Sequence, residues 1–247
     1  MKYKKQIFTI LILALLVALA ASASAESSGI AVKQTVTSLL SNIMPNCVTP
    51  WNSIPDTPVI DRTAFISPHA SVIGAVTIGA NVLVSPFASV RGDEGMPIFI
   101  GKDSNVQDGV VVHALETIDE NGKPKNLVDV NGKKYAVYVS QRVSLAHQSQ
   151  IHGPAFVGSD TFIGMQALVF KANVGNNCVL EPKSGAIGVT IPDGKYIPAG
   201  VVITNQTDAN SLKNVADDPN YAYKTTNEAV VYVNTNLAKG YRKSGLY

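Results

Sequence analysis

Residues 139–169 read VSQRVSLAHQSQIHGPAFVGSDTFIGMQALV, and an aliphatic residue returns at every sixth position. The aliphatic positions here are Val139, Leu145, Ile151, Val157, Ile163 and Val169. Earlier in the chain the same period gives Ile60, Ile66, Val72, Ile78, Val84, Val90, Ile100, Val106 and Val112. A hexapeptide period with small residues in most fifth positions is typical of a parallel β-helix. We therefore expect a mainly β fold in which three hexapeptides form each coil of a solid triangular prism.

The rest of the chain divides around this repeat. We expect the β-helix domain at residues 59–204, with about five to six coils and loops at 92–99 and 114–138. The proline-rich residues 26–58 predict an irregular N-terminal wrap. Residues 205–247 predict a linker and a C-terminal α-helix that packs along the prism. Cap-type residues begin this helix at Thr226, and an apolar stripe of Ala229, Val230, Val233 and Leu237 ends before Gly240.

The first 25 residues have the layout of a secretory signal peptide. Lysines at positions 2, 4 and 5 precede an apolar run from Ile7 to Ala20, and Ala23-Ser24-Ala25 supplies small residues at the cleavage position. We expect an exported protein without a stable membrane span after cleavage. Removal of the leader leaves 17 Lys and Arg against 18 Asp and Glu, a net charge of −1. This balance argues against a nucleic-acid partner.

The two cysteines, Cys47 and Cys178, are too few for a disulfide scaffold. Cys178 falls on a small inward position of the repeat, whereas Cys47 lies in the N-terminal wrap. The pattern favours an inert buried thiol and a spare one over a bridge between them.

Three of the four histidines lie in the repeat and predict a metal site. His113 and His152 each follow an inward aliphatic residue, so their side chains point outward. His147 lies two residues after Leu145, near a corner of the coil, so the three imidazoles do not converge easily within one chain. A ring of subunits would bring them together, and a trimer is the smallest such ring. Three imidazoles with one open position make a catalytic zinc-type site.

Polar side chains near the histidines suggest how such a site works. A water bound to the metal would have its pKa lowered to about 7 and would act as hydroxide at neutral pH. Glu94, in the first break of the repeat, and Glu116, three residues after His113, are placed to carry the released proton. Glu116 has the alternative of being a solvated loop acid. Gln107 and Asn105 could orient the hydroxide or a small oxyanion.

Arg91 and Asp108 are a second pair of charged residues near the repeat. They could form an ion pair within one subunit or across an interface between two. This supporting role is at least as consistent with the sequence as a catalytic one. The fourth histidine, His69, stands alone in an early coil and is predicted to be solvated.

Four motifs resemble those of the gamma-class carbonic anhydrases, and above all the exported archaeal prototype of that class. They are RGDEGMP at 91–97, NVQDG at 105–109, HALE at 113–116 and SLAHQSQIHG at 144–153. The resemblance extends from about Val48 to Tyr241. It implies a left-handed β-helix, a homotrimer with three interfacial metal sites, and the reversible hydration of CO2 to bicarbonate. The metal would be Zn2+, with Fe2+ admitted by the resemblance and Co2+ by the imidazole ligands.

The resemblance also implies roles for single residues. His113 and His152 would come from one subunit and His147 from the next. Glu94 would take part in proton transfer near the metal, and Glu116 would be the shuttle to solvent. Gln107 and Asn105 would orient the hydroxide, Asn234 would help to position bicarbonate, and Arg91 and Asp108 would form an ion pair that supports the interface. The chain departs from the prototype in the loop after Glu116, which carries Lys123 and Lys125 here, whereas the corresponding loop of the prototype is more acidic.

Two other functions fit the repeat. A hexapeptide acyltransferase would use one histidine as a base and bind a coenzyme thioester between subunits, but it does not need three histidines with flanking glutamates. A non-catalytic trimeric scaffold or metal-binding module would have lost turnover. The presence of Glu94, Gln107 and Glu116 argues against this loss.

Overall fold

The computed structural model describes residues 41–245. The predicted signal peptide and the first part of the predicted wrap, residues 26–40, lie outside the described residues. By its internal contacts the chain divides into residues 1–40 and 41–247, and the second unit contains the whole repeat. Within the described part of the chain, no helix combines the length and the apolar character needed to cross a membrane.

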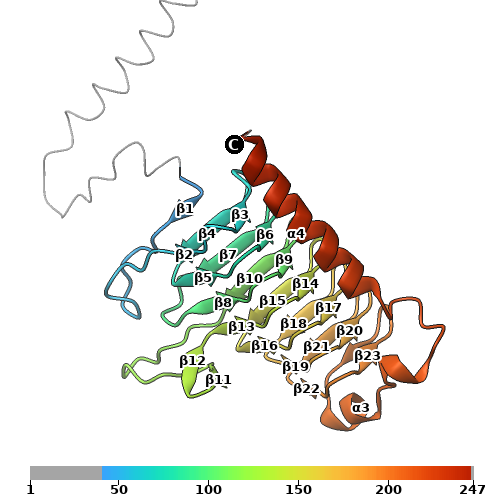
Figure 1. Ribbon diagram of the computed structural model, residues 1–247. Coiled ribbons are helices and arrows are strands. Elements are labelled where there is room, and N and C mark those ends of the chain that lie inside the picture. The colour runs from blue at the N-terminus through green and yellow to red at the C-terminus, as the bar shows by residue number, and fades with distance from the viewer. Residues whose placement is uncertain (1–40, 246–247) are drawn as a thin grey trace, which may run out of the picture. The chain divides into compact units, whose positions relative to one another are not determined.

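The repeat forms three parallel sheets that stack coil upon coil (Figure 1). The first sheet contains β1 (Ile43–Met44), β4 (Ser71–Gly74), β7 (Ser89–Gly92), β10 (Val111–Ala114), β15 (Gln150–Gly153), β18 (Leu168–Phe170), β21 (Gly185–Ile187) and β24 (Val202–Ile203). The second contains β2 (Val59–Ile60), β5 (Val76–Ile78), β8 (Ile98–Ile100), β13 (Val137–Val139), β16 (Ala155–Val157), β19 (Asn173–Val174) and β22 (Thr190–Ile191). The third contains β3 (Phe65–Ile66), β6 (Leu83–Val84), β9 (Asn105–Val106), β14 (Ser144–Leu145), β17 (Phe162–Ile163), β20 (Val179–Leu180) and β23 (Tyr196–Ile197).

The aliphatic first positions fill the interior of the prism, as the period predicts. Val112 pairs with Val90 on one side and with Ile151 on the other, and the side chains of all three are fully buried. The mainly β hexapeptide fold is therefore confirmed. The expectation of five to six coils was wrong, because the first sheet has eight strands. The period shifts by one residue at Val174 and again at Ile191, and β1 adds a strand from a segment that was expected to be irregular.

Many corners of the coils are turned by a residue in the left-handed region. Nine non-glycine residues, each three positions after an inward first residue, have φ between 53° and 63°. They are Asn81, Phe87, Asp103, Arg142, Gln148, Asp160, Gln166, Asn177 and Lys183. The glycines at second positions have a different cause. A Cβ at Gly101 would lie 2.5 Å from the backbone of Ser140 on the next coil, so the stacking distance requires glycine there.

Both interruptions of the repeat leave the prism at the same corner. Residues 93–97 connect β7 of the first sheet to β8 of the second, and residues 115–136 connect β10 to β13. The longer connection includes a hairpin of β11 (Val128–Val130) and β12 (Lys133–Tyr135). Because β7 and β10 are neighbours in the first sheet, the two interruptions lie on adjacent coils.

The chain ends with α3 (Gln206–Ser211), the short 3-10 helix at Val215–Asp217 and the long helix α4 (Thr226–Ser244). Figure 1 shows α4 lying along the third sheet, where it contacts β3, β6, β9 and β14. The predicted helix exists, but it does not end before Gly240; it continues to Ser244 and is capped by Gly245 in the left-handed region.

The face that α4 turns toward the sheet differs from the predicted stripe. Ala238 and Asn234 are buried, whereas Val233 and Leu237 are about half exposed. Val230 packs against a small cluster that includes Phe162 and Val179. The buried side of the helix is therefore partly polar at Asn234.

Candidate metal centre

His113 and His152 lie side by side on the outer face of the first sheet. The register pairs them directly across β10 and β15, on adjacent coils. Val112 and Ile151, which precede them, are fully buried, so the alternation of the strand turns both imidazoles outward. The two ring centroids are 5.5 Å apart, with the rings nearly perpendicular. The structure thus brings together two nitrogen ligands that are 39 residues apart in the sequence.

Two carboxylates from the 93–97 connection reach the same histidine. Asp93 Oδ1 lies 3.0 Å from His113 Nε2, and Glu94 Oε1 lies 3.5 Å from the same nitrogen. Asp93, Glu94 and His113 are the one group of three potential metal ligands within 4.8 Å of one another among residues 41–245. Nitrogen and oxygen donors of this kind suit zinc and other divalent transition metals, so these residues fit a metal site.

Sequence reasoning missed Asp93. Its signal was its place directly before Glu94 in the RGDEG motif. The structure also gives Arg91 a different partner from the predicted one, because Arg91 Nη1 lies 2.7 Å from Asp93 Oδ2. An Arg91–Asp108 pair within one subunit, one of the two predicted alternatives, does not form. Arg91 lies on β7 of the first sheet and Asp108 in the turn after β9 of the third sheet, whereas Asp93 is only two positions from Arg91.

Burial and neighbouring charges separate the two carboxylates in their affinity for protons. Burial raises the pKa of Glu94, and the neighbouring carboxylates Asp93 and Glu116 also raise it, against the opposing effects of His113 and Arg91. Burial also acts to raise the pKa of Asp93, but the His113 hydrogen bond and Arg91 outweigh it, so the pKa is lowered. Glu94 is therefore the better proton acceptor of the pair.

Desolvation also sets the protonation state of His152. Burial lowers the pKa of its imidazole, and the charge of His113 acts in the same direction. The neutral form of the ring is thereby favoured. Neutral imidazole is the form that binds a metal.

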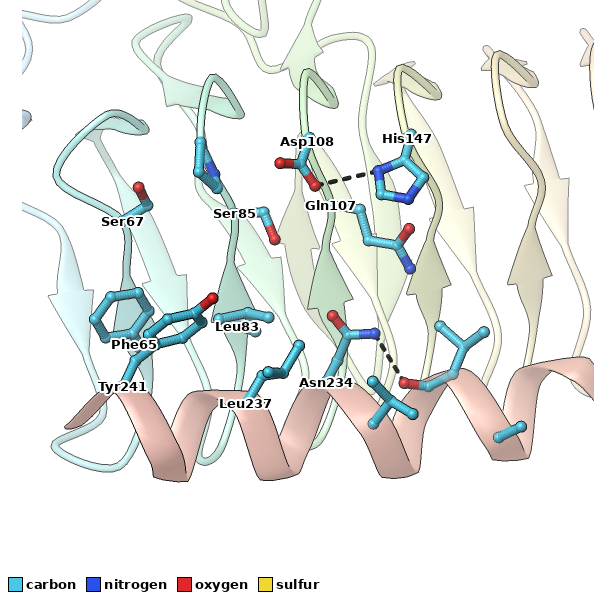
Figure 2. A pocket seen from close by; sticks show the side chains of 14 residues that line it. Phe65, Ser67, Leu83, Ser85, Gln107, Asp108, His147, Asn234, Leu237 and Tyr241 are labelled. Carbon is cyan, nitrogen blue, oxygen red and sulfur yellow. Dashed lines mark hydrogen bonds and ion pairs between the residues drawn. The ribbon is translucent and has the colours of Figure 1, made fainter. Parts of the chain in front are cut away.

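His147 and His152 lie near opposite ends of the same strand, β15, and therefore at two different corners of the prism. His147 follows β14 of the third sheet and precedes β15, whereas His152 is near the end of β15. The side chain is more than half exposed, and its Nδ1 lies 3.1 Å from Asp108 Oδ2. Figure 2 shows His147 beside Asp108 and Gln107, above the helix α4. One chain therefore presents two of the predicted histidine ligands near one corner of the prism and the third near another corner.

A groove of about 530 Å³ runs between the third sheet and α4 beside His147. Gln107 and Asn234 line it, together with apolar residues of the sheet and the helix (Figure 2). Asn234 Nδ2 donates to the backbone oxygen of Val230, one turn earlier in the helix. The groove thus contains four of the predicted site residues, Gln107, Asp108, His147 and Asn234, but not His113 or His152.

A buried chain of amides holds Gln107 in this groove. Gln107 Nε2 donates to Asn105 Oδ1 at 2.8 Å, and Asn105 Nδ2 donates to Ser144 Oγ at 3.0 Å. Asn105 and Ser144 are fully buried. Asn105 therefore acts on the groove through Gln107 and does not line it.

The cysteines are unpaired, as the sequence favours. Cys47 is exposed and Cys178 is buried. Burial raises the pKa of the Cys178 thiol to about 11. His69 is exposed, and its ring stacks on Phe87 with centroids 6.1 Å apart.

Fold and side chains define a hexapeptide-repeat β-helix protein with a cluster of potential metal ligands at one corner of the prism. No protein-family model matches the chain. The chain is 65% identical over 248 residues to the carbonic anhydrase of Methanosarcina thermophila, covering 99% of this chain and 100% of that protein. It is 41% identical over 194 residues to a carboxysome assembly protein of a Nostoc species, covering 78% of this chain and 33% of that longer protein.

Among solved structures, a putative acetyltransferase from Bacillus cereus has a TM-score of 0.59 with 19% identity, covering 82% of this chain and 99% of that one. This likeness shows the fold alone. The chain belongs to the gamma-class carbonic anhydrases, the family that its motifs predict.

Proposed function

We infer that this protein is a carbonic anhydrase, a lyase that catalyses the reversible hydration of CO2 to bicarbonate and a proton. The observation that carries this conclusion is the 65% identity to a carbonic anhydrase over 99% of the chain. The geometry agrees with it, because a neighbouring pair of imidazoles has a carboxylate of raised pKa beside it.

We propose that the site holds a zinc ion, with ferrous iron or cobalt as alternatives that suit imidazole ligands. His113 and His152 of one subunit and the partner subunit's His147 would hold it. When bound, such an ion lowers the pKa of a coordinated water to about 7 and thereby supplies hydroxide at neutral pH. The separation of the ligands supports a shared site, because one chain presents them near two corners of the prism. A closed ring of three subunits would repeat this contact three times.

The other site residues would act on the substrate and on the proton. Glu94, 3.5 Å from His113 Nε2, would accept the proton released beside the imidazoles, and Glu116 would pass it to solvent. Gln107, held by Asn105, would orient the nucleophile from its place beside His147. Asn234, on the same groove, would help to position bicarbonate. Arg91 and Asp108 would pair between subunits and support the interface.

The two competing functions have weaker support. Hexapeptide transferases share the fold, but two solved structures of that kind are only 22% and 19% identical to this chain. A scaffold without turnover would not need a buried amide chain to position Gln107. An acyltransferase does not explain why two imidazoles and two carboxylates meet at one corner of the prism.

We also propose that the protein is exported, because its first 25 residues have the signal-peptide pattern. Expression of the full chain in a secreting host tests this. N-terminal sequencing of the recovered protein should begin after Ala25, and an unprocessed intracellular product would contradict export.

The activity is tested by stopped-flow CO2 hydration with the metal-loaded protein, together with metal analysis and sedimentation. We expect catalysis that requires the metal, one metal per subunit and a trimeric mass. His113→Ala should lose both metal and activity. Hydration no faster than buffer in a fully loaded trimer would refute the enzyme, and an active protein without metal would refute the site.

A further inference from the structure

The 115–136 connection begins with a tight turn that returns to Glu116. The turn closes at residues 119–123, where the backbone N–H of Asp119 donates to the carbonyl of Lys123 at 2.9 Å. The N–H of Lys125 then donates to the carbonyl of Thr117 at 2.8 Å. These backbone contacts bring Lys125 back beside the start of the loop, whatever its side chain is.

This turn is attached to the candidate metal centre through Thr117. The Thr117 side chain is buried, and both its hydroxyl and its backbone N–H donate to the carbonyl oxygen of Glu94. Glu116 directly precedes Thr117, so the hydrogen bonds from Thr117 to Glu94 hold the backbone of Glu116 close to the candidate metal centre. Its own carboxylate points out of the protein and is about half exposed.

An ion pair restrains this exposed carboxylate. Lys125 Nζ lies 2.8 Å from Glu116 Oε1, and Asn126 Nδ2 donates to the Glu116 backbone oxygen at 2.8 Å. The hydrogen bond from Lys125 lowers the pKa of Glu116, and the more distant charge of Lys171 adds to this effect. The same contact raises the pKa of Lys125.

We propose that Lys125 is a positioning residue for proton release, because its ammonium holds the Glu116 carboxylate in an ion pair that must open before Glu116 can carry a proton to solvent. This proposal rests on the proposed carbonic anhydrase function. It adds a residue that slows the shuttle, and Lys125 itself touches neither substrate nor metal.

The proton balance gives the direction of the effect. In each turnover Glu116 accepts one proton and passes it to a buffer base B, so the net reaction is CO2 + H2O + B → HCO3⁻ + BH⁺. A shuttle works best when its pKa lies near the working pH, and an ion pair that favours the carboxylate moves it away from that value. Removing the ammonium should therefore speed the steps that involve Glu116.

Three variants isolate the ion pair. Lys125→Gln removes the charge, and Lys125→Arg keeps it. Lys123→Gln is the matched control, because Lys123 lies in the same loop and its ammonium forms no ion pair within residues 41–245. Each zinc-loaded protein is assayed by stopped flow at low and at high buffer concentration. The ionisation of Glu116 is followed separately by carbon-13 NMR of its carboxyl group.

At low buffer, kcat of Lys125→Gln should rise about two- to fivefold, the range expected for loss of an exposed ion pair. Its kcat/KM should not change, and the difference in kcat should vanish at high buffer, where B takes the proton directly. The NMR midpoint of Glu116 should rise in Lys125→Gln and stay at the wild-type value in Lys125→Arg and Lys123→Gln.

Two failures can be distinguished. If the wild type hydrates CO2 but Lys125→Gln has an unchanged or lower kcat at low buffer, or an unmoved Glu116 midpoint, the proposal for Lys125 is wrong. An equal rise in Lys123→Gln would also overturn it. If the loaded wild type does not hydrate CO2 at all, the proposed function fails and the proposal fails with it.

Discussion

Mixed trimers of two inactive variants should regain one site in three. His147→Ala keeps the pair near one corner of the prism, and His113→Ala keeps the single histidine near another corner. A shared site is intact only where a His147→Ala subunit offers its pair to a His113→Ala neighbour. In a closed ring of three that contains both variants, this order occurs once, so about one third of the sites is restored.

The experiment uses two affinity tags. The variants are mixed, refolded with zinc and purified on both tags in turn, which removes the homotrimers. Metal content and kcat per subunit should both reach about one third of the wild-type values, since each ring restores one site. The control is a mixture of His113→Ala with His152→Ala. These two ligands come from the same subunit, so no arrangement of the ring restores a site.

Two outcomes would refute the reasoning. Mixed trimers of His147→Ala and His113→Ala that bind no more metal than either variant alone would exclude a site shared between subunits. Recovery in the His113→Ala and His152→Ala mixture would show that one subunit does not supply both of these histidines to one site.

Three other predictions concern single positions. Gly101→Ala should lower the free energy of unfolding, measured by urea denaturation, by about 1–3 kcal/mol, because its Cβ would meet the next coil. Gly240→Ala is the control: this position faces open space on α4, so the substitution should raise the free energy of unfolding by about 0.5–1 kcal/mol. Because burial raises the pKa of the Cys178 thiol from 9.0 to about 11, the protonated thiol stabilises the folded state. This contribution to the free energy of unfolding is complete below pH 9 and is lost as pH rises through about 11. Wild type should therefore lose about 2–3 kcal/mol across that interval relative to Cys178→Ala, measured by denaturation at pH 8 and pH 11. Asn105→Ala removes the acceptor that holds Gln107 and should lower kcat/KM about tenfold while zinc binding, measured by metal analysis, is retained.

The period of six predicts the part of the fold that depends on one rule. An aliphatic residue at each first position must point inward, so the buried stack of Val90, Val112 and Ile151 could be read from the sequence. The outward direction of His113 and His152 follows from the same rule. The direct pairing of the two histidines did not follow from this rule. The long connection at residues 115–136 lies between them, and its length leaves the number of coils that separate them undetermined from the sequence.

The parts that were missed lie where the period fails. Asp93 belongs to a connection with no repeat, and its contact with His113 depends on how the chain leaves β7. The pairing of Lys125 with Glu116 depends on the turn at 119–123, which no local periodicity encodes. The last coils contain two steps of five, from Val169 to Val174 and from Ala186 to Ile191, which shift the period, so their number was underestimated.

The flat sides of the prism explain why this enzyme would need its neighbour. Side chains that point outward from one sheet of a β-helix diverge from those at the next corner, so a single chain can gather two imidazoles but not surround an ion with three. His113 and His152 occupy directly paired positions on adjacent coils, and adjacent coils are separated by only the spacing of two neighbouring strands. His147, exposed near another corner beside Gln107, has the position of a ligand offered outward. The repeat therefore keeps the three predicted histidine ligands apart within residues 41–245, and the proposed ring of subunits would bring them together.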